Sequence, residues 1–275
     1  MELTYLGANT LLLTKPGSSL LIDPHFTRPS LLSLLGKIRP EPHAVEAGLG
    51  SIEHLDGVLL THAHYDHALD AAEVLHQTGG RCFGSESAFN LIRGYPLAAT
   101  ACIPVSSKTV YSIGAFQVCF HPSQHITFPP PFGWMLPKKG QIPQPMRPPA
   151  WFWDYQCGSV YAIQVDRMLI FGSAGFEPGA YQDLEVKTVV MGIGGLDLMP
   201  MAYLNHLYQE TVLSTGAKQV YLSHWDNFFR PLRQDAHPHV LARRSISRLK
   251  RLGACYGHTV SLLQIRKTIS DDQKF

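Results

Sequence analysis

Thr61-His62-Ala63-His64-Tyr65-Asp66-His67 is the most informative stretch of the 275-residue chain, because it brings four metal-ligand side chains into six positions. The apolar run before it, Gly57-Val58-Leu59-Leu60, is typical of a buried strand. In an extended chain the two-residue spacing puts His62 and His64 on the same side. We expect a helix over about residues 68–76, and the turn into it directs Asp66 and His67 back toward the same point.

This cluster predicts a metal site at the end of a strand. Imidazole nitrogens and a carboxylate are the ligands that suit zinc and the neighbouring divalent transition metals. The alternative is a polar turn in which Asp66 only complements the dipole of the following helix. The density of ligand-type residues in so short a stretch favours the metal site.

Three later apolar runs also end in polar residues that could join this cluster. Val118-Cys119-Phe120 leads to His121 and His125, Leu169-Ile170-Phe171 leads to Gly172-Ser173, and Val220-Tyr221-Leu222 leads to Ser223-His224. Ligands are expected where neighbouring strands end at one edge of a sheet. We therefore expect these strand ends to converge on the first cluster.

The order of the predicted elements indicates mixed α/β layers, because early strands are followed by alternating strands and helices. The chain shows no internal repeat. We expect strands at about residues 10–13, 20–22, 57–60, 116–120, 160–165, 168–171 and 219–222. Besides the helix at 68–76, we expect helices at about residues 87–93, 202–213 and 239–252.

Residues 126–153 form an unusual segment that holds eight of the twenty prolines and three of the four tryptophans. Proline is incompatible with a regular helix or a central strand, so we expect a long ordered cover. The segment follows His125 directly, and its aromatic residues are Phe128, Phe132, Trp134, Trp151, Phe152 and Trp153. With Trp225 beside His224, we expect all four tryptophans near the site. They favour a lid over a partly apolar substrate, with a static cover or a subunit interface as the alternatives.

The overall composition is that of an ordinary globular protein, with a formal net charge of only +2 that does not favour nucleic-acid binding. No apolar stretch is long enough to span a bilayer, and we recognise no signal peptide. Five cysteines without a paired motif are expected to be reduced, as in the cytoplasm. The predicted last helix carries a basic face, for which solvent exposure is a better explanation than contact with a membrane surface. Nothing in the sequence indicates an oligomeric state.

The cluster His62-x-His64-x-Asp66-His67 resembles the HxHxDH signature of the metallo-β-lactamase superfamily. Leu20-Leu21-Ile22-Asp23-Pro24 resembles the opening strand of that family, whose aspartate supports the ligand loop. Ser123-Gln124-His125 and Ser223-His224-Trp225 resemble its later histidine motifs, so that the resemblance extends over about residues 3–228. It implies a four-layer αββα sandwich that forms a single domain over residues 1–275, with residues 126–153 as an insertion.

The same resemblance implies a ligand set and a cofactor. His62, His64 and His125 would hold one metal ion, and Asp66, His67 and His224 would hold a second. The implied metal is zinc, as one or two ions, with manganese as an alternative. His121 is a weaker candidate than His125, because a surface or core histidine explains it better.

The closest pattern is that of the branch that contains ascorbate-phosphate lactonases and N-acyl-phosphatidylethanolamine phospholipase D. His206 and the pair His224-Trp225 match residues of that branch. The resemblance implies hydrolysis by metal-activated water, with a small-molecule phosphodiester, lactone or related ester as the substrate. Asp66 would orient the water and accept its proton, and His206 would contact a substrate phosphate or carboxylate. An ordinary histidine on a helix face is the alternative for His206.

Ser173 departs from the family pattern, because a metal-bridging aspartate normally occupies that position. A neutral hydroxyl is a poor substitute for an anionic ligand that draws two dications together. Glu177 and Asp154 are the candidates for the missing carboxylate. The alternative function is a catalytically impaired binding protein that kept the fold, and a nuclease of the same superfamily is disfavoured by the low net charge.

Overall fold

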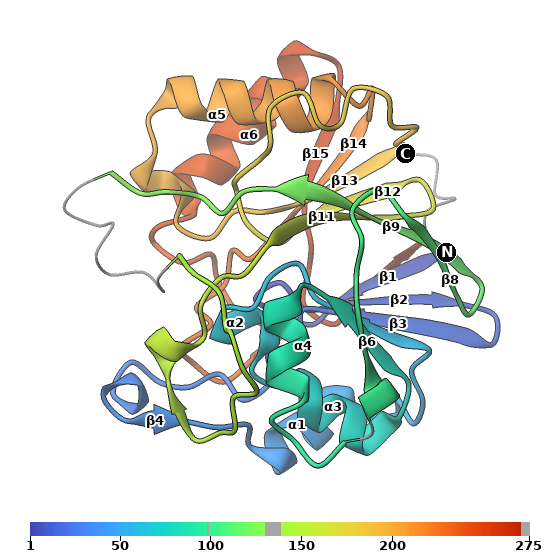
Figure 1. The fold of residues 1–275 in the computed structure, drawn as a ribbon. Coiled ribbons are helices and arrows are strands. Elements are labelled where there is room, and N and C mark those ends of the chain that lie inside the picture. Colours follow the sequence, from blue (N-terminus) through green and yellow to red (C-terminus); the bar gives the residue numbers. More distant parts are fainter. Residues whose placement is uncertain (98, 130–138, 271–275) are drawn as a thin grey trace.

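The computed structural model describes residues 1–97, 99–129 and 139–270, which build two facing β-sheets of seven strands each (Figure 1). The first sheet has, in spatial order, β16 (Thr268–Ser270), β1 (Glu2–Tyr5), β2 (Leu11–Lys15), β3 (Ser18–Ile22), β5 (Gly57–Leu59), β6 (Arg81–Gly84) and β7 (Cys102–Pro104). The second has β15 (Thr259–Leu262), β14 (Gln219–Ser223), β13 (Thr188–Gly192), β12 (Met168–Phe171), β11 (Val160–Val165), β9 (Phe116–Ser123) and β8 (Val110–Ile113).

Helices cover the outer face of each sheet, which gives the four-layer αββα arrangement (Figure 1). The first sheet carries α1 (Pro42–Leu49), α3 (Ala71–Thr78) and α4 (Glu86–Ile92), and α2 (Tyr65–Ala68) follows β5. The second sheet carries α5 (Met201–Tyr208), which continues into the π-helix η6 (Gln209–Leu213), and α6 (Arg243–Cys255). The expected fold class is therefore confirmed.

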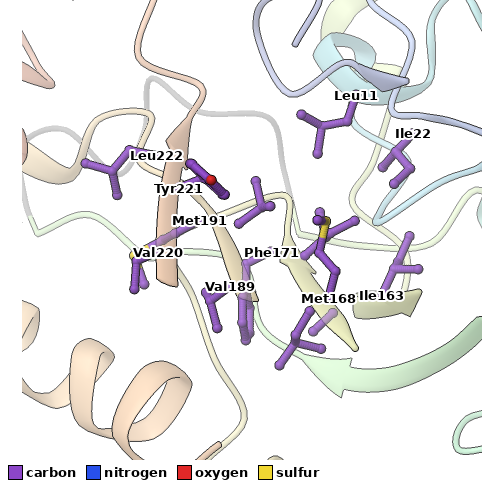
Figure 2. Packing of buried hydrophobic residues seen from close by; sticks show 14 of the residues in the cluster. Leu11, Ile22, Ile163, Met168, Phe171, Val189, Met191, Val220, Tyr221 and Leu222 are labelled. Carbon is purple, nitrogen blue, oxygen red and sulfur yellow. The ribbon is translucent and has the colours of Figure 1, made fainter. Parts of the chain in front are cut away.

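Strands with two buried faces explain why apolar runs, rather than alternating patterns, mark the inner strands. In β3, Leu20 and Ile22 point into the core between the sheets, whereas Leu21 packs with the helices on the other face. Figure 2 shows Leu11 and Ile22 of the first sheet and Ile163 of the second within this central core. The two sheets are thus held together by apolar packing, which is the main stabilising term of such a sandwich.

Parallel pairing in the middle of each sheet positions the polar strand ends. β3 pairs with β5 so that Ile22 lies opposite Leu59, and the chain leaves both strands at the same edge. β12, β13 and β14 are also parallel to one another. The segments after β3 and β5 therefore begin at one edge of the first sheet, and those after β12 and β14 begin at one edge of the second, as the sequence predicts.

Some predicted boundaries were wrong. The helix expected at 68–76 is two helices, α2 and α3, and the second runs to Thr78. The last helix begins at Arg243 and not near residue 239, because Asp197 accepts hydrogen bonds from the backbone N–H groups of Arg244 (2.9 Å) and Ser245 (2.6 Å) and so fixes its first turn. The edge strands β15 and β16 and the neighbouring strand β1 were not predicted.

The Pro/Trp-rich segment at 126–153 is partly described, and Phe132 and Trp134 lie outside the described residues. Its later part is fastened to α4: Asn90 Nδ2 donates to the carbonyl oxygen of Ile142 (2.8 Å), and the N–H of Met146 donates to the carbonyl of Asn90 (3.1 Å). A two-residue strand, β10 (Ala150–Trp151), pairs with β4 (Lys37–Ile38). This described part is attached to α4 and β4 and has only short regular elements, as the prolines predict; its role as a lid or a static cover stays a prediction.

Among the described residues, no helix combines the length and the apolar character that crossing a membrane requires.

Gly94 allows the close approach between this cover and α4, because a Cβ at position 94 would lie 1.9 Å from the carbonyl oxygen of Met146. We expect Gly94→Ala to lower the free energy of unfolding by about 1–3 kcal/mol, because backbone must shift to make room. Gly36→Ala is the control, since its Cβ would meet only the Ser33 carbonyl at 3.7 Å. Thermal unfolding compares the two variants, and equal melting temperatures would contradict the packing described here.

Candidate metal centre

The structure brings the six predicted ligand residues together in two groups of three. His62, His64 and His125 form one group, and Asp66, His67 and His224 form the other, with the ligand atoms of each group within 4.8 Å of one another. His62 and His64 follow β5, and Asp66 and His67 lie in α2. His125 follows β9 and His224 follows β14, so the second sheet contributes one histidine to each group.

The hydrogen bonds of three histidines leave the same ring nitrogen available. The Nδ1 atoms of His62, His125 and His67 lie 3.0 Å from Thr61 Oγ1, 2.8 Å from the Ile126 carbonyl oxygen and 2.7 Å from Asp23 Oδ2, respectively. Because the Thr61 hydroxyl donates to Asp23 (2.6 Å), its oxygen accepts from His62. Each Nδ1 is therefore inferred to carry the proton, and each Nε2 presents a lone pair.

Lone pairs that face one another without a proton between them repel, unless a cation lies among them. The Nε2 atom of His62 is buried and has no hydrogen-bond partner among the described residues. Rings of the same group lie close, with centroids 5.1 Å apart for His62–His125 and 4.6 Å apart for His64–His125. This donor set fits a divalent transition metal.

The second group has the spacing of ligands that share one ion. Asp66 Oδ2 lies 3.6 Å from His67 Nε2 and 3.4 Å from His224 Nε2. These distances are long for charged hydrogen bonds, but they are close to the ~3.3 Å between ligand atoms of a tetrahedral zinc site with bonds of about 2.0–2.1 Å. A carboxylate and two imidazoles are thus arranged around a common point.

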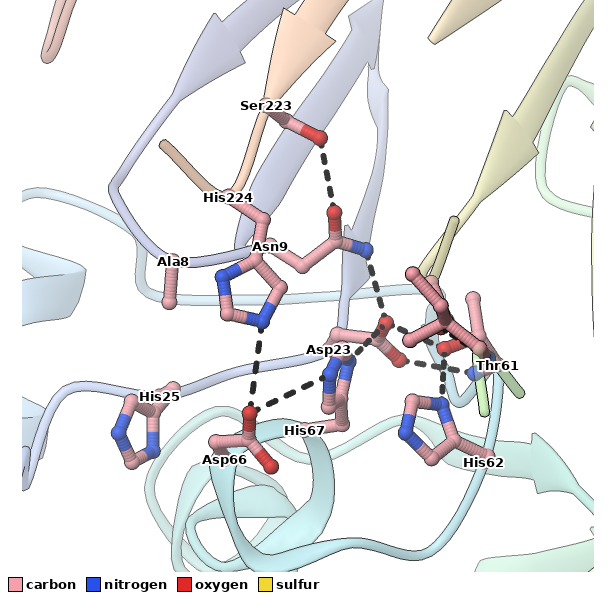
Figure 3. Close-up of polar contacts among 12 residues, drawn as sticks. Ala8, Asn9, Asp23, His25, Thr61, His62, Asp66, His67, Ser223 and His224 are labelled. Carbon is pink, nitrogen blue, oxygen red and sulfur yellow. Dashed lines mark hydrogen bonds and ion pairs between the residues drawn. The ribbon is translucent and has the colours of Figure 1, made fainter. Parts of the chain in front are cut away.

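Asp23 supports both groups from behind (Figure 3). Its carboxylate is fully buried and accepts hydrogen bonds from Asn9 Nδ2 (2.9 Å), the Thr61 N–H (2.8 Å), the Thr61 hydroxyl and His67 Nδ1. Ser223 in turn donates to Asn9 Oδ1 (2.8 Å). The network fixes His67 directly and His62 through Thr61, as expected for residues that orient metal ligands.

The site favours positive charge at its centre. Burial raises the pKa of Asp66, but His67 and His224 outweigh this effect and hold it well below its usual value, so that Asp66 is a carboxylate. Burial lowers the pKa of His62 strongly and that of His125 to about 4, which keeps both imidazoles neutral and able to bind metal. Burial also lowers the pKa of His67, but Asp66 and Asp23 outweigh it and raise the value.

His224 is held by a second buried network. Its backbone has a left-handed φ of 56°, and its N–H donates to the Tyr5 hydroxyl (3.2 Å). The Tyr5 hydroxyl donates to Asp226 Oδ1 (2.6 Å), and Arg28 forms a buried ion pair with the same carboxylate. No sequence pattern indicates this network, because Tyr5, Arg28 and Asp226 are far apart along the chain.

His25 is a further residue that the sequence analysis missed. It is fully buried after β3, and neither ring nitrogen has a hydrogen-bond partner among the described residues. The rings of Tyr65 and Phe228 lie on either side, with centroid distances of 6.0 and 6.2 Å. Phe228 also contacts His224 (5.1 Å), so His25 belongs to the wall of the second group.

Ser173 does not replace the bridging carboxylate, but it positions the His125 loop, because its Oγ accepts from the N–H of Ile126 (3.0 Å). The residues expected to compensate make other contacts. Glu177 accepts from Gln124 Nε2 (2.9 Å), and Asp154 accepts from the N–H of Trp151 (3.0 Å). Neither carboxylate belongs to the two groups that the described residues form.

Other predicted residues lie outside the two groups. His206 is on α5, half-exposed, with its ring against Phe176 and its Nε2 3.6 Å from Glu210; its contact with a substrate stays a prediction. His121 is a core residue bonded to Gln164 (2.9 Å), as expected. Placing Trp225 at the substrate cavity was wrong, because this ring is buried against Tyr5 and its Nε1 donates to the Leu263 carbonyl (3.0 Å).

Comparison with known proteins agrees with this geometry. Residues 3–81 match the model of the metallo-beta-lactamase superfamily. A UPF0173 metal-dependent hydrolase of Herpetosiphon aurantiacus is 29% identical over 124 residues, which are 45% of this chain and 46% of the relative. The chain thus spans less than half the length of the curated relatives that it matches.

Solved structures show the same fold over nearly the whole chain. A metallo hydrolase of the archaeon Ignicoccus hospitalis, Igni18, superposes with a TM-score of 0.60 at 17% identity and covers 99% of both chains. The metallo-beta-lactamase fold protein YhfI of Bacillus subtilis superposes with a TM-score of 0.55 at 14% identity and covers 98% of both chains. The chain therefore has the metallo-β-lactamase fold, and its residues 3–81 match the model of that superfamily. The narrower resemblance to the lactonase and phospholipase branch stays a prediction.

Asp23→Asn tests the support of the ligands. Asparagine tolerates the left-handed φ of 45° at this position but cannot provide an anionic acceptor for His67. We expect zinc affinity, measured by competition with a chromogenic chelator, to fall about 10–100-fold. Asp166→Asn, at a surface ion pair with Lys15, is the control that should leave zinc affinity unchanged. A folded Asp23→Asn protein with the parent's affinity would refute this role.

His25→Phe tests the buried, unpartnered imidazole. Burial, with Arg28 nearby, lowers the pKa of His25 from 6.5 to about 3, so the folded state favours the neutral ring. This contribution to stability is present above pH 6.5 and is lost as the pH falls toward 3. As the pH falls through this range, we expect the free energy of unfolding of the variant to rise relative to that of the parent by up to about 1.4 kcal/mol per pH unit. Thermal unfolding at several pH values measures the difference, with the fully exposed His43→Gln as the control. A difference that does not vary with pH would contradict the prediction.

Proposed function

We propose that this protein is a metal-dependent hydrolase that acts on a phosphodiester, a lactone or a related ester through metal-activated water. The observation that carries the proposal is the meeting of six ligand residues from two sheets in two groups. Zinc is the metal that this donor set favours, with manganese as the alternative. The preserved donors argue against the alternative of an impaired binding protein, and Ser173 favours one tightly held ion over two.

A divalent ion bound by these residues would supply Lewis acidity and lower the pKa of a water molecule to about 7. His62, His64 and His125 would hold it, and hydrogen bonds at Nδ1 set the orientation of the Nε2 atoms of His62 and His125. Asp66 remains a carboxylate at neutral pH and would accept a proton from the attacking water. His224 Nε2 lies 3.4 Å from Asp66 Oδ2 and would keep that carboxylate oriented toward the site.

The walls of the site support a substrate that carries an apolar part. His25 contacts both Tyr65 and Phe228 beside the second group, and Phe229 packs on Phe228 with ring centroids 4.3 Å apart. Apolar walls with a few polar groups are typical of sites for small organic ligands. We therefore propose a small-molecule ester as the substrate, and a cytoplasmic location fits the five free cysteines.

Hydrolysis of bis(p-nitrophenyl) phosphate and of an acyl homoserine lactone tests the proposal. We expect a chelator to abolish turnover of at least one of these substrates and zinc or manganese to restore it. Asp66→Asn should lower kcat by about 10²–10⁴-fold, because the variant loses a ligand and the proton acceptor.

His121→Gln is the matched control, since His121 is also buried, on the strand β9 that leads to His125, but lies outside both groups; it should keep the parent's activity. Turnover that persists in chelator, or an Asp66→Asn variant as active as the parent, would overturn the proposed mechanism.

A further inference from the structure

A cavity lies beside the Arg28–Asp226 ion pair that helps to hold His224. It is lined by Arg28 and by residues of the connection between β14 and α6, from Asp226 to Arg243, and its volume is about 450 Å³. None of the six predicted metal ligands lines it. The cavity is therefore separate from the candidate catalytic site, although Asp226 is only two residues from His224.

The lining of this cavity has an excess of positive charge. Arginines contribute four cations and aspartates contribute two anions: Arg28, Arg230, Arg233, Arg243, Asp226 and Asp235. Both carboxylates are already paired, Asp226 with Arg28 and Asp235 with Arg233 through two hydrogen bonds of 3.0 Å. Within the described ranges, neither Arg230 nor Arg243 has an acidic partner, so these two charges are available for a ligand.

Arg28 is fixed in place at the wall of this cavity. Its side chain is only 3% exposed. Nε donates to the carbonyl oxygen of Arg230 (2.7 Å), and Nη2 contacts Asp226 and the Asn227 carbonyl (3.1 Å). Nη1 is buried and has no partner among the described residues. These contacts hold the Arg28 guanidinium at the wall of the cavity.

We propose that this cavity binds the phosphate group of a small organic molecule. Arginine is suited to phosphate because its planar guanidinium presents several N–H donors at once. Leu232, Ala236 and Val240 also line the cavity and provide apolar contacts for the organic part. The volume lies in the range of small-molecule sites and exceeds the need of a bare ion.

Binding of phenylphosphonate to the metal-loaded protein tests the proposal, because its P–C bond resists ester hydrolysis. Calorimetric titration is expected to show binding that is tighter than that of inorganic phosphate. The double variant Arg230→Gln/Arg243→Gln should weaken it by at least about tenfold. Arg244→Gln is the matched control, since Arg244 is exposed on the same helix but does not line the cavity.

The charge-conserving Arg230→Lys/Arg243→Lys variant should retain most of the binding, which separates loss of charge from loss of structure. Vesicles with phosphatidic acid distinguish a lipid phosphate from a soluble one. If the parent co-sediments with these vesicles and the Gln double variant does not, the site is supported and its ligand is a lipid phosphate. If phenylphosphonate does not bind, or binds equally well to the parent and the Gln double variant, the proposal is overturned. Equal binding would place the phosphonate at the metal centre and leave the proposed hydrolase unaffected.

Discussion

The carboxylate of Asp23 is buried at the end of β3 and accepts four hydrogen bonds from residues 9, 61 and 67. A buried carboxylate is tolerated only when its oxygens are satisfied in this way. Because His67 binds it directly and His62 binds it through Thr61, the orientation of both metal groups depends on this one interaction. The parallel pairing of β3 with β5 is what places Asp23 beside the histidine loop.

The site joins two kinds of stabilisation that make opposite demands. Apolar packing holds the sheets together without directional preference, whereas the imidazoles must meet at defined angles. Left-handed backbone at Ala8, Asp23, Arg28 and His224 shows where the chain accepts strain to meet that demand. Hydrogen bonds to these four residues or their neighbours hold the strained positions. Asp226 holds both Ala8 and Arg28, because its carboxylate accepts from the Ala8 N–H (2.8 Å) and from the Arg28 guanidinium.

Apolar runs that end in histidine predicted mixed α/β layers and the convergence of strand ends, whereas the four-layer arrangement and the full set of six ligands were implied by the family resemblance. His25 could not be recognised, since a single histidine after Pro24 has no spacing that relates it to the others. The Arg28–Asp226 pair joins residues 198 positions apart, and only the folded chain brings them together. Trp225 was misjudged because an aromatic residue beside a ligand suits a cavity wall and a core equally well. The start of α6 depends on Asp197, a contact from another element.

The division of the donors between the sheets has a consequence for the order of folding. Within each group, two donors follow β5 and one belongs to the second sheet, so neither group is complete until the sandwich has closed. An ion can bind fully only to that closed state, and its binding free energy then adds to the free energy of unfolding. Metal uptake would accordingly be a late event that locks the two halves of the sandwich together, and its rate would report on their docking.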